Sequence, residues 1–466
     1  MFNGDKTSEG TNGEETIAAI ATAPGEGGIS VIRISGPAAF SIADALFTGQ
    51  GAPPSQRRHG TFAFGRIRDQ DHDLDEVLML FMRGPRSYTG EDTVEIQGHG
   101  GSQCARRILR AVLRRNARLA EPGEFTKRAF LAGRIDLLQA EAVLDLIRAR
   151  SERAAAAALD QMEGGLSASF AVLYDDLVVV AASLEATLDF PEDELPAPYL
   201  DGIRASLAKV QQAAEALLAT WEEGHLLRDG AVAVISGRAN VGKSTLLNAL
   251  LGKDRAIVSA MPGTTRDTIE ESLVLQGIPV RLVDTAGLRE TDCEVEQEGI
   301  RRTQAHIEKA DLHIHVIDVS HPLDEVEQAR LQRLDPKRSI LLLNKVDLGR
   351  AADLSGLPAL RTIETSLISG QGLEAIKGVM AEMLAGHADL SSRPHATISE
   401  RHRSILLAAL DETRMAAGLL SAGGDEALVP ACTHLRAALE SLGQATGRVY
   451  HDELLKTIFS QFCIGK

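Results

Sequence analysis

The stretch Val232–Leu247, which reads VAVISGRANVGKSTLL, decides the fold of the central part of the chain. Its apolar start predicts a strand and its end predicts a helix, and Gly237, Gly242, Lys243 and Ser244 between them fit G-x-x-x-x-G-K-[ST]. The glycines let backbone N–H groups approach phosphate oxygens, and the helix N-terminus adds positive potential. We expect Lys243 to reach the outer phosphates of a nucleotide and Ser244 to ligate Mg²⁺. The alternative is a glycine-rich turn that fits the pattern by accident.

Three further motifs accompany the phosphate loop in the sequence. Asp284–Gly287 (DTAG) closes a predicted strand, where the aspartate can hold the Mg²⁺ shell and the glycine N–H can contact the γ-phosphate. Asn344–Asp347 (NKVD) closes another strand; its asparagine can read the N7 edge of guanine and its aspartate can accept from N1–H and the exocyclic amine. Gly263–Asp267 (GTTRD) lies between the phosphate loop and DTAG and supplies Thr265 as a second Mg²⁺ ligand. Each motif alone is a common turn, but together they predict a GTP hydrolase.

Two departures from the Ras pattern concern the catalytic step. The residue after DTAG is Leu288, so the glutamine that orients the attacking water is missing. We look for its replacement in Glu290–Glu298, which carries four glutamates; the alternative is that these form a solvated acidic face. Asn240 lies inside the phosphate loop, where its amide oxygen can help to hold K⁺ in place of an arginine finger. A hydrogen bond that stabilises the loop is the alternative role for Asn240.

Composition limits the class of protein. At 466 residues the chain is long enough for about three domains. Four scattered cysteines without metal-ligand spacing are typical of reduced thiols in a cytoplasmic protein. No apolar run approaches the ~20 residues of a membrane span and no signal peptide opens the chain, so we expect no membrane association. The net charge of −16 argues against an indiscriminate nucleic-acid binder but leaves room for a local basic surface.

The pattern along the chain predicts a multidomain α/β protein in five segments. Residues 1–14 are a polar, glycine-rich tail that we expect to be disordered. Residues 15–130 predict an α+β domain with strands at 28–34, 77–82 and 93–97 and a helix at 104–119. Residues 131–228 are helical, residues 229–385 alternate strands with helices as in a mostly parallel sheet, and residues 386–466 are helical again. A Ras-like P-loop GTPase domain is therefore expected to be inserted into an all-α domain.

The sequence finishes with Phe462–Lys466, which reads FCIGK. A lone cysteine is more often a small buried hydrophobe than a nucleophile, and this is the favoured interpretation of Cys463. Because Lys466 is close in sequence, a reactive thiol is the alternative.

These stretches give the chain a resemblance to a known family over essentially its whole length after the tail. Thr16–Gly36, Tyr88–Gly101, Pro122–Asp136, the GTPase motifs and the terminal FCIGK resemble the MnmE (TrmE) family of tRNA-modification GTPases. The resemblance implies a homodimer formed through N-terminal folate-binding domains. It also implies a heterotetramer with the flavoprotein MnmG, which adds an aminomethyl or carboxymethylaminomethyl group to carbon 5 of the wobble uridine of tRNA. The one-carbon unit would come from 5-formyl- or methylene-tetrahydrofolate.

The resemblance also implies roles for single residues. Glu296 would position the attacking water, and Cys463 would be the thiol proposed for the family. Opposite charges suit the glutamate tail and the pterin N–H groups of a folate, whose contacts would be Arg33, Glu95, Arg134 and Lys466. Without the resemblance, cross-strand ion pairing is the alternative role for Arg33 and Glu95.

The resemblance also implies which residues bind the nucleotide and the metal ions. Mg²⁺ would be bound by Ser244 and Thr265, and K⁺ by Asn240, Ser259, Met261 and Thr264. The expected GTP contacts, in chain order, are Asn240, Val241, Gly242, Lys243, Ser244, Thr245, Ser259, Ala260, Met261, Pro262, Gly263, Thr264, Thr265, Asp284, Thr285, Ala286, Gly287, Asn344, Lys345, Val346, Asp347, Ser366 and Leu367.

The chain departs from the family pattern in places, and other functions are compatible with parts of it. Ser366–Ile368 (SLI) stands where Ser-Ala-Lys is usual, and Cys293 replaces a usual acidic or polar residue. The arginine-rich residues 106–118 are a candidate tRNA or partner surface, or simply a solvated helix face. The alternative function is a GTP-dependent binding switch, for instance in ribosome assembly, without group-transfer chemistry. A scaffold that binds GTP without turnover is a third hypothesis.

Overall fold

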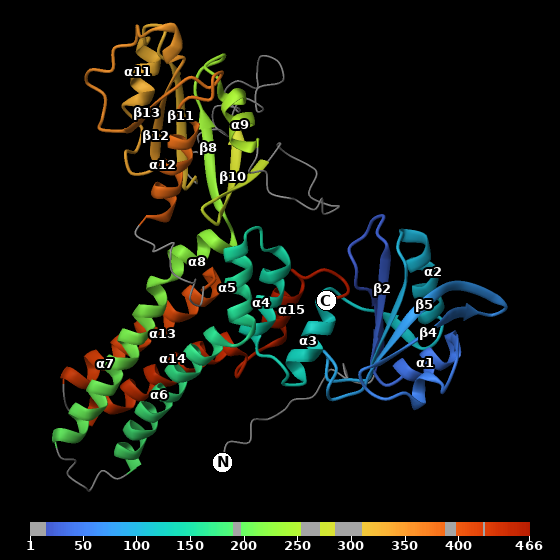
Figure 1. Cartoon of the computed structure of the whole chain (residues 1–466). Coiled ribbons are helices and arrows are strands. Elements are labelled where there is room, and N and C mark those ends of the chain that lie inside the picture. The colour runs from blue at the N-terminus through green and yellow to red at the C-terminus, as the bar shows by residue number, and fades with distance from the viewer. Residues whose placement is uncertain (1–14, 190–196, 253–270, 285–309, 387–397, 423–424) are drawn as a thin grey trace, which may run out of the picture. The chain divides into compact units, whose positions relative to one another are not determined.

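The computed structural model describes residues 15–189, 197–252, 271–284, 310–386, 398–422 and 425–466 (Figure 1). The chain divides into two compact units. Unit 1 comprises residues 1–144 and 443–466, and unit 2 comprises residues 145–442. The tail at 1–14, the GTTRD segment and the stretch that contains Glu296 all lie outside the described residues. The domain boundaries expected from the sequence therefore stay predictions.

Unit 1 is built on a seven-stranded sheet with the strand order β3-β4-β5-β6-β2-β1-β7. Neighbouring strands are antiparallel except β1 and β7, which run parallel. The strands are β1 (Thr16–Ile20), β2 (Ile29–Ser35), β3 (Phe47–Gly49), β4 (Thr61–Asp69), β5 (His72–Met82), β6 (Thr93–His99) and β7 (Ala117–Leu119). Alternate residues of each strand face opposite sides, so one face of this sheet can bury apolar residues while the other carries polar ones.

Two helices, α1 (Ala39–Leu46) and α2 (Ser102–Leu113), cover one face of this sheet (Figure 1). Ile32 of β2, Ile96 of β6 and Ile108 of α2 are fully buried in the core between them. Arg33 is the next residue after Ile32, and Glu95 is the residue before Ile96, so both lie on the opposite face, where their Cα positions pair across the strands.

The helix predicted at residues 104–119 is wrong at its carboxyl end. The observed helix α2 ends at Leu113, and residues 117–119 form strand β7 beside β1. Asn116 adopts a left-handed φ of 60°, a conformation that asparagine tolerates better than most residues and that stops a helix. The end of the helix was not predicted because the arginines on both sides of Asn116 continue the polar pattern of the helix.

The remainder of unit 1 is helical. Helices α3 (Glu124–Leu131), α4 (Leu137–Arg148) and α15 (Asp452–Phe459) contribute to a separate apolar cluster in which Leu137 and Leu455 are almost fully buried. Residues around position 140 thus share one core with residues near the carboxyl terminus.

Unit 2 contains a six-stranded sheet with the order β13-β12-β11-β8-β10-β9. Its strands are β8 (Ala231–Ser236), β9 (Glu271–Leu275), β10 (Ile278–Asp284), β11 (Leu312–Asp318), β12 (Ser339–Asn344) and β13 (Arg361–Thr365), flanked by α9 (Lys243–Leu251), α11 (Glu325–Leu331) and α12 (Leu373–Ala385). All neighbours are parallel except β9 and β10, which form an antiparallel hairpin at the edge. The predicted class, a multidomain α/β protein with a mostly parallel P-loop sheet, is confirmed.

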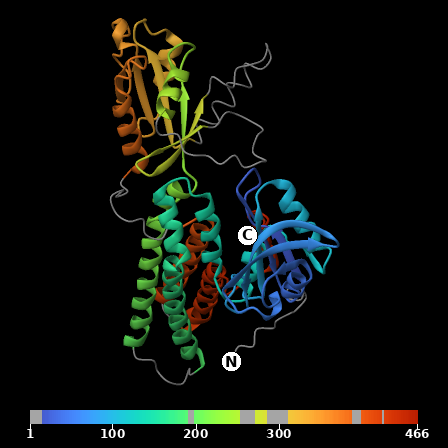
Figure 2. The ribbon, with the colours of Figure 1, turned by 45° about the vertical axis from the view of Figure 1, so that its right-hand side comes forward.

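The other part of unit 2 is an all-α bundle. It is made of α5 (Glu152–Met162), α6 (Gly165–Asp189), α7 (Ala197–Ala219), α8 (Trp221–Arg228), α13 (Glu400–Ala422) and most of α14 (Leu428–Thr446). Figures 1 and 2 show α6, α7, α13 and α14 side by side, and Arg436 of α14 forms an ion pair with Glu185 of α6 at 2.8 Å. The GTPase sheet lies between α8 and α13 in the sequence, as predicted.

Helix α6 is the one described helix that is long and apolar enough to cross a membrane, with a mean hydropathy of 1.5 over Gly165–Leu188. Asp175 and Asp176 interrupt its apolar residues, and Phe170 and Leu177 are fully buried in unit 2. A single helix of this kind is a weak indication, because core helices pass the same test.

Candidate functional site

The phosphate loop has the strand–loop–helix form predicted from the sequence, with β8 before it and α9 after it. Gly237 and Gly242 both adopt left-handed φ values, 142° and 110°. A Cβ at Gly237 would lie 2.3 Å from the backbone oxygen of Val316, and one at Gly242 would lie 2.4 Å from Asn344 Nδ2. Both positions therefore require glycine, because neighbouring parts of the sheet close in on the loop.

The side chains of this loop divide into a buried lysine and exposed polar groups. Lys243 is buried, and its Nζ donates hydrogen bonds to the carbonyl oxygens of Gly237 and Arg238 at 3.0 and 2.6 Å. Asn240, Ser244 and Thr245 are exposed, and the last two lie in the first turn of α9. A hydroxyl here suits Mg²⁺, which prefers hard oxygen ligands, so Ser244 fits the predicted ligand role. The N-terminal end of α9 also favours phosphate.

Asn344 joins the phosphate loop to the loop after β13. Its side chain is buried, and Nδ2 donates to the carbonyl oxygen of Val241 at 2.8 Å. Its Oδ1 accepts from the backbone N–H of Leu367 at 3.1 Å. The amide retains one N–H for a base edge. The sequence predicted base recognition at Asn344, but no pattern in the sequence indicated this connection between two loops.

The predicted guanine-binding residues lie around the end of β12. Asp347 is exposed and belongs to the short 3₁₀ helix Val346–Leu348. Lys345 has a left-handed φ of 65°, and its Nζ lies 2.5 Å from Asp318 Oδ2 at the end of β11. Burial acts to raise the pKa of Asp318, but hydrogen bonds from Lys345 and Ser320 outweigh it, so the pKa is lowered. An ionised Asp318 holds the motif in place.

The structure describes only part of the remaining predicted nucleotide site. Asp284 ends β10, beside Ile235 of β8, which places its backbone next to the start of the phosphate loop. Ser366 and Leu367 are buried after β13, and Ile368 is 89% exposed. The predicted ligands from 259 to 265, the residues Thr285–Gly287 and Glu296 lie outside the described residues.

A buried polar network directly behind the phosphate loop was not predicted. Ser236 Oγ lies 2.6 Å from His313 Nε2 and 2.7 Å from His315 Nδ1. His315 Nε2 lies 2.6 Å from Glu327 Oε1 of α11. In the sequence, His313 and His315 only alternate with apolar residues of a strand, which indicates no partner for them. The network ties α11 and β11 to the last residue of β8.

We expect His313 to make stability depend on pH. Burial lowers the pKa of the His313 imidazole to about 4, and His315 adds to this effect. The unfolded chain, with a histidine pKa of ~6.5, binds the proton first, so folding stability falls as the pH drops from about 6.5 to 4, by at most about 3 kcal/mol. Urea unfolding midpoints measured by circular dichroism between pH 4 and 7.5 should fall less steeply in His313→Leu than in the wild type.

The matched control is a histidine outside the network. His321 is exposed, so His321→Leu should keep the wild-type slope. Identical slopes for all three proteins would show that His313 is not held neutral by burial.

A second cluster of predicted residues lies on the face of the unit 1 sheet that is opposite to α1 and α2. Arg33 Nε donates to Glu95 Oε1 at 2.8 Å, which fits the cross-strand pair considered from the sequence. The Arg33 guanidinium carbon also lies 5.6 Å from the ring centroids of both Tyr88 and Phe125. Tyr88 Oη lies 2.9 Å from Thr126 Oγ1. The two aromatic residues were not predicted, although both belong to stretches that carry the family resemblance.

The segment Cys463–Lys466 packs into the same area. Ile464 forms a bridge with Pro122, and the backbone oxygen of Lys466 accepts from the N–H of Phe125 at 3.2 Å. A Cβ at Gly465 would lie 2.4 Å from the backbone oxygen of Ile20, so only glycine allows this approach to β1. Burial lowers the pKa of the Lys466 ammonium, and the Arg33 guanidinium contributes in the same direction.

Cys463 and Arg134 were also predicted to belong to this cluster. The interpretation of Cys463 as a buried hydrophobe is wrong, because its side chain is exposed. Arg134 is exposed and donates to the backbone oxygen of Pro85 at 2.8 Å, so its hydrogen bond is directed to the turn before β6 and not to Arg33 or Lys466.

A buried charge network supports the elements around this cluster and was also not predicted. Arg128 of α3 is 4% exposed and binds both carboxylate oxygens of Glu91 at 3.0 Å and Glu124 Oε1 at 2.9 Å. Burial acts to raise the pKa of Glu124, but hydrogen bonds from Arg118, Arg128 and a backbone N–H lower it. These charges connect β7, α3 and the turn before β6.

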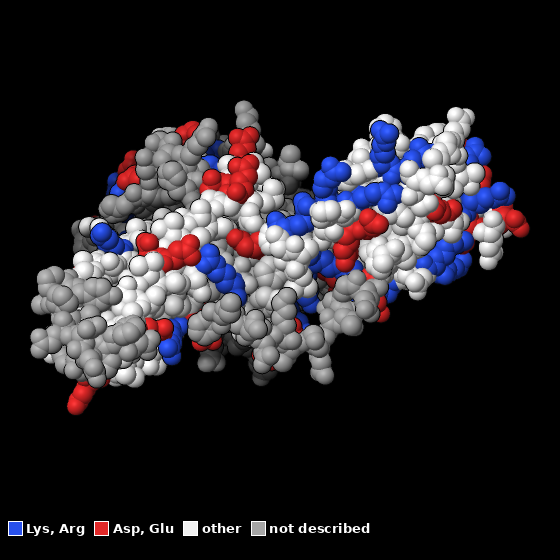
Figure 3. Space-filling model, turned by 90° about the horizontal axis from the view of Figure 1, so that it is seen from below, with Lys and Arg blue, Asp and Glu red and all other residues white. Residues whose placement is uncertain are grey.

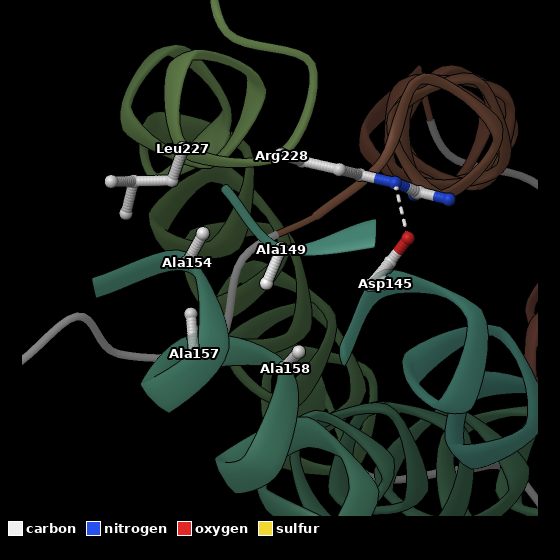
Figure 4. A pocket seen from close by; sticks show the side chains of 7 residues that line it. All are labelled: Asp145, Ala149, Ala154, Ala157, Ala158, Leu227 and Arg228. Carbon is white, nitrogen blue, oxygen red and sulfur yellow. Dashed lines mark ion pairs between the residues drawn. The ribbon is translucent and has the colours of Figure 1, made fainter. Parts of the chain in front are cut away.

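The small hollow between α5 and α8 is not a reaction site. Figure 4 shows alanine side chains and Leu227 around it, and an ion pair between Arg228 and Asp145 at one side, with a separation of 2.9 Å. Apart from this satisfied pair, its lining offers no group that could react or bind a metal.

Comparison with known proteins assigns the family. The model of the MnmE helical domain matches residues 137–463, and that of the GTP-binding protein TrmE N-terminus matches residues 16–134. The tRNA modification GTPase MnmE of Geotalea uraniireducens is 44% identical over 458 residues, covering 97% of this chain and 99% of that protein. The protein of the same name from Geobacter sulfurreducens is 43% identical, with the same coverage.

Among solved structures, the G domain of the T. maritima FeoB iron transporter is 26% identical with a TM-score of 0.25, covering 33% of this chain and 98% of that one. The family assignment comes instead from the sequence relatives and from the two domain models. The chain belongs to the MnmE (TrmE) family of tRNA modification GTPases, and it is a GTP hydrolase whose reaction is tied to tRNA modification.

Proposed function

We propose that this GTPase depends on potassium and acts as a homodimer with the flavoprotein MnmG. Together they add an aminomethyl or carboxymethylaminomethyl group to carbon 5 of the wobble uridine of certain tRNAs in the cytoplasm, from a folate one-carbon unit. The observation that carries the proposal is that the segment Cys463–Lys466 lies against the Arg33–Glu95 pair in a chain that also has a complete phosphate loop.

The cluster in unit 1 has the chemistry that a folate requires. The Arg33 guanidinium and the Lys466 ammonium suit the carboxylates of its glutamate tail, and Glu95 can accept hydrogen bonds from pterin N–H groups. Tyr88 and Phe125 add aromatic rings next to Arg33. When bound, the folate would supply the one-carbon unit. The exposed Cys463 thiol lies on the segment that faces this cluster, and a role in the transfer is part of the proposal.

Different residues of the nucleotide domain have different roles in the proposed hydrolysis of GTP. Lys243 and the first N–H groups of α9 bind the phosphates, Ser244 and Thr265 would hold Mg²⁺, and Asp347 selects guanine. Asn240, with Ser259, Met261 and Thr264, would hold K⁺, which supplies positive charge at the transferred phosphate. Asn240 has a left-handed φ of 62°, and it is exposed at the loop. Glu296 would orient the attacking water.

Replacing K⁺ by Na⁺ at constant ionic strength should lower the GTP hydrolysis rate about tenfold or more. The reason is that K⁺ is proposed to supply the positive charge that an arginine finger supplies in other GTPases. Phosphate release by the full-length protein in the two chloride salts measures this effect. Asn240→Ala should show the low rate in both salts. Equal wild-type rates in K⁺ and Na⁺ would remove the cation from the mechanism.

The deciding test of the whole proposal is nucleoside analysis of tRNA from a strain in which the gene is deleted. The wobble modification should disappear and return when the gene is restored. Retained modification in the deletion strain would favour the alternative function, a GTP-dependent binding switch in ribosome assembly.

A further inference from the structure

Helix α2 and the residues after it carry a concentrated positive charge. Residues 102–118 contain six arginines and no acidic residue, in a chain with a net charge of −16. Figure 3, which views the molecule from below, shows lysine and arginine side chains with acidic ones among them over the part that carries the labels α1, β4 and β5 in Figure 1. How much of this charge is available to a binding partner depends on how many of the six arginines are paired within the protein.

Three of the six arginines are neutralised by carboxylates. Arg114 and Arg115 bind the two oxygens of Asp69 at 3.0 and 2.8 Å. Arg118 binds Glu15 and Glu124, both at 2.6 Å. These arginines connect α2 and β7 to neighbouring elements, and their charge is compensated within unit 1.

The other three arginines, Arg106, Arg107 and Arg110, have no carboxylate partner among the described residues. All three are exposed, and Arg106 Nε donates to the backbone oxygen of Ser102, one turn earlier in the same helix, at 3.0 Å. Ile108 and Val112 on the inner side of the helix are fully buried, so the three guanidinium groups lie on its outer side. Arg106 and Arg110 are one turn apart, a rise of about 6 Å.

We propose that Arg106, Arg107 and Arg110 form a binding surface for the sugar–phosphate backbone of the tRNA substrate. Guanidinium groups bind phosphate oxygens in a bidentate manner, and uncompensated ones retain their full attraction for a polyanion. The surface lies on the side of the sheet opposite to the Arg33–Glu95 pair, so it holds the tRNA without contacting the one-carbon donor. This inference rests on the proposed function, in that it takes tRNA as the substrate.

The test is the full-length double variant Arg107→Ala/Arg110→Ala. Alanine preserves the helix, since it has the highest helix propensity. Affinity for a fluorescently labelled tRNA transcript, measured by anisotropy over a series of KCl concentrations, should fall, and the slope of log K against log salt should decrease by about one to two, as expected for two lost phosphate contacts. The GTP hydrolysis rate without tRNA should be unchanged.

The matched control removes two exposed arginines from helices of the bundle. Arg414 pairs with Glu215, and Arg436 pairs with Glu185. Arg414→Ala/Arg436→Ala makes the same change in net charge, so it should leave the salt slope close to that of the wild type. Equal loss of affinity in both double variants would reduce the effect to net charge and overturn the proposal.

Two other results distinguish a failure of the proposed tRNA surface from a failure of the proposed function. An unchanged slope in Arg107→Ala/Arg110→Ala would overturn the proposed surface, and lost binding to a protein partner with normal tRNA binding would assign the arginines to that partner instead. Neither result affects the deletion-strain test, in which only a retained wobble modification would contradict the proposed function.

Discussion

Replacing Glu296 by alanine should leave GTP binding nearly intact and lower its hydrolysis by between about 10²- and 10⁴-fold, the usual contribution of a group that activates water. The reason is chemical. Leu288 follows the DTAG motif, and an apolar side chain cannot orient a water molecule, so another residue must do so. Glu296 is the candidate in the acidic stretch. Single-turnover phosphate release, together with the affinity for a fluorescent GTP analogue, separates the chemical step from binding.

The neighbouring glutamates provide the control for this prediction. Glu298→Ala changes the charge of the same stretch by the same amount, so it should hydrolyse GTP at close to the wild-type rate. Normal hydrolysis by Glu296→Ala would move the role to another residue of the stretch. A parallel loss of nucleotide affinity would instead indicate a structural role for Glu296.

The second large effect is expected at Asp347. Its carboxylate is expected to accept two hydrogen bonds from guanine, from N1–H and from the exocyclic amine. Asp347→Asn places an amide there, with only one acceptor and with a donor facing the amine. Since charged hydrogen bonds are worth about 1.5–3 kcal/mol each, GTP affinity should fall by about 10²- to 10⁴-fold. Titration of the full-length variant with GTP, followed by calorimetry, measures this loss.

Xanthosine triphosphate makes the prediction for Asp347 specific. Xanthine has a carbonyl oxygen in place of the exocyclic amine, so the amide N–H of Asp347→Asn can donate to it. The variant should therefore bind xanthosine triphosphate better than the wild type does. Equal weakening towards both nucleotides would mean that the substitution damages the fold, and unchanged GTP binding would remove Asp347 from base recognition.

The sequence predicted most of the GTPase sheet because its strands are short apolar runs that end in recognisable motifs. Strand β12 is fully buried along its length, which is why Ile340–Leu343 reads as a strand without any alternation. Strand β4 was not predicted from the sequence. Its exposed positions include the large apolar residues Phe62 and Phe64, and small residues are buried between them, whereas a half-buried strand usually exposes polar residues and buries large apolar ones. The end of α2 was misplaced because arginines continue across Asn116.

In the candidate sites, the motif residues could be predicted from the sequence, but the contacts that hold them could not. Motif residues such as Lys243 and Asn344 are recognisable because phosphate and guanine impose fixed spacings on the chain. The contacts that hold these residues depend on elements that are distant in sequence, such as His315 with Glu327, or Arg33 with Phe125. The periodic pattern of apolar and polar residues within one helix or strand carries no information about these contacts. Only the pairing of strands and the packing of helices bring them together.

The bonds of Asn344 have a consequence for how variants of the nucleotide site should be interpreted. The Asn344 side chain is hydrogen-bonded to both Val241 and Leu367, so one residue connects the loop expected to contact phosphate with the loop expected to contact the base. Substitutions on the two sides should therefore show a coupling free energy, and their separate effects should not sum. Ranking the importance of residues here requires double-mutant cycles that pass through position 344.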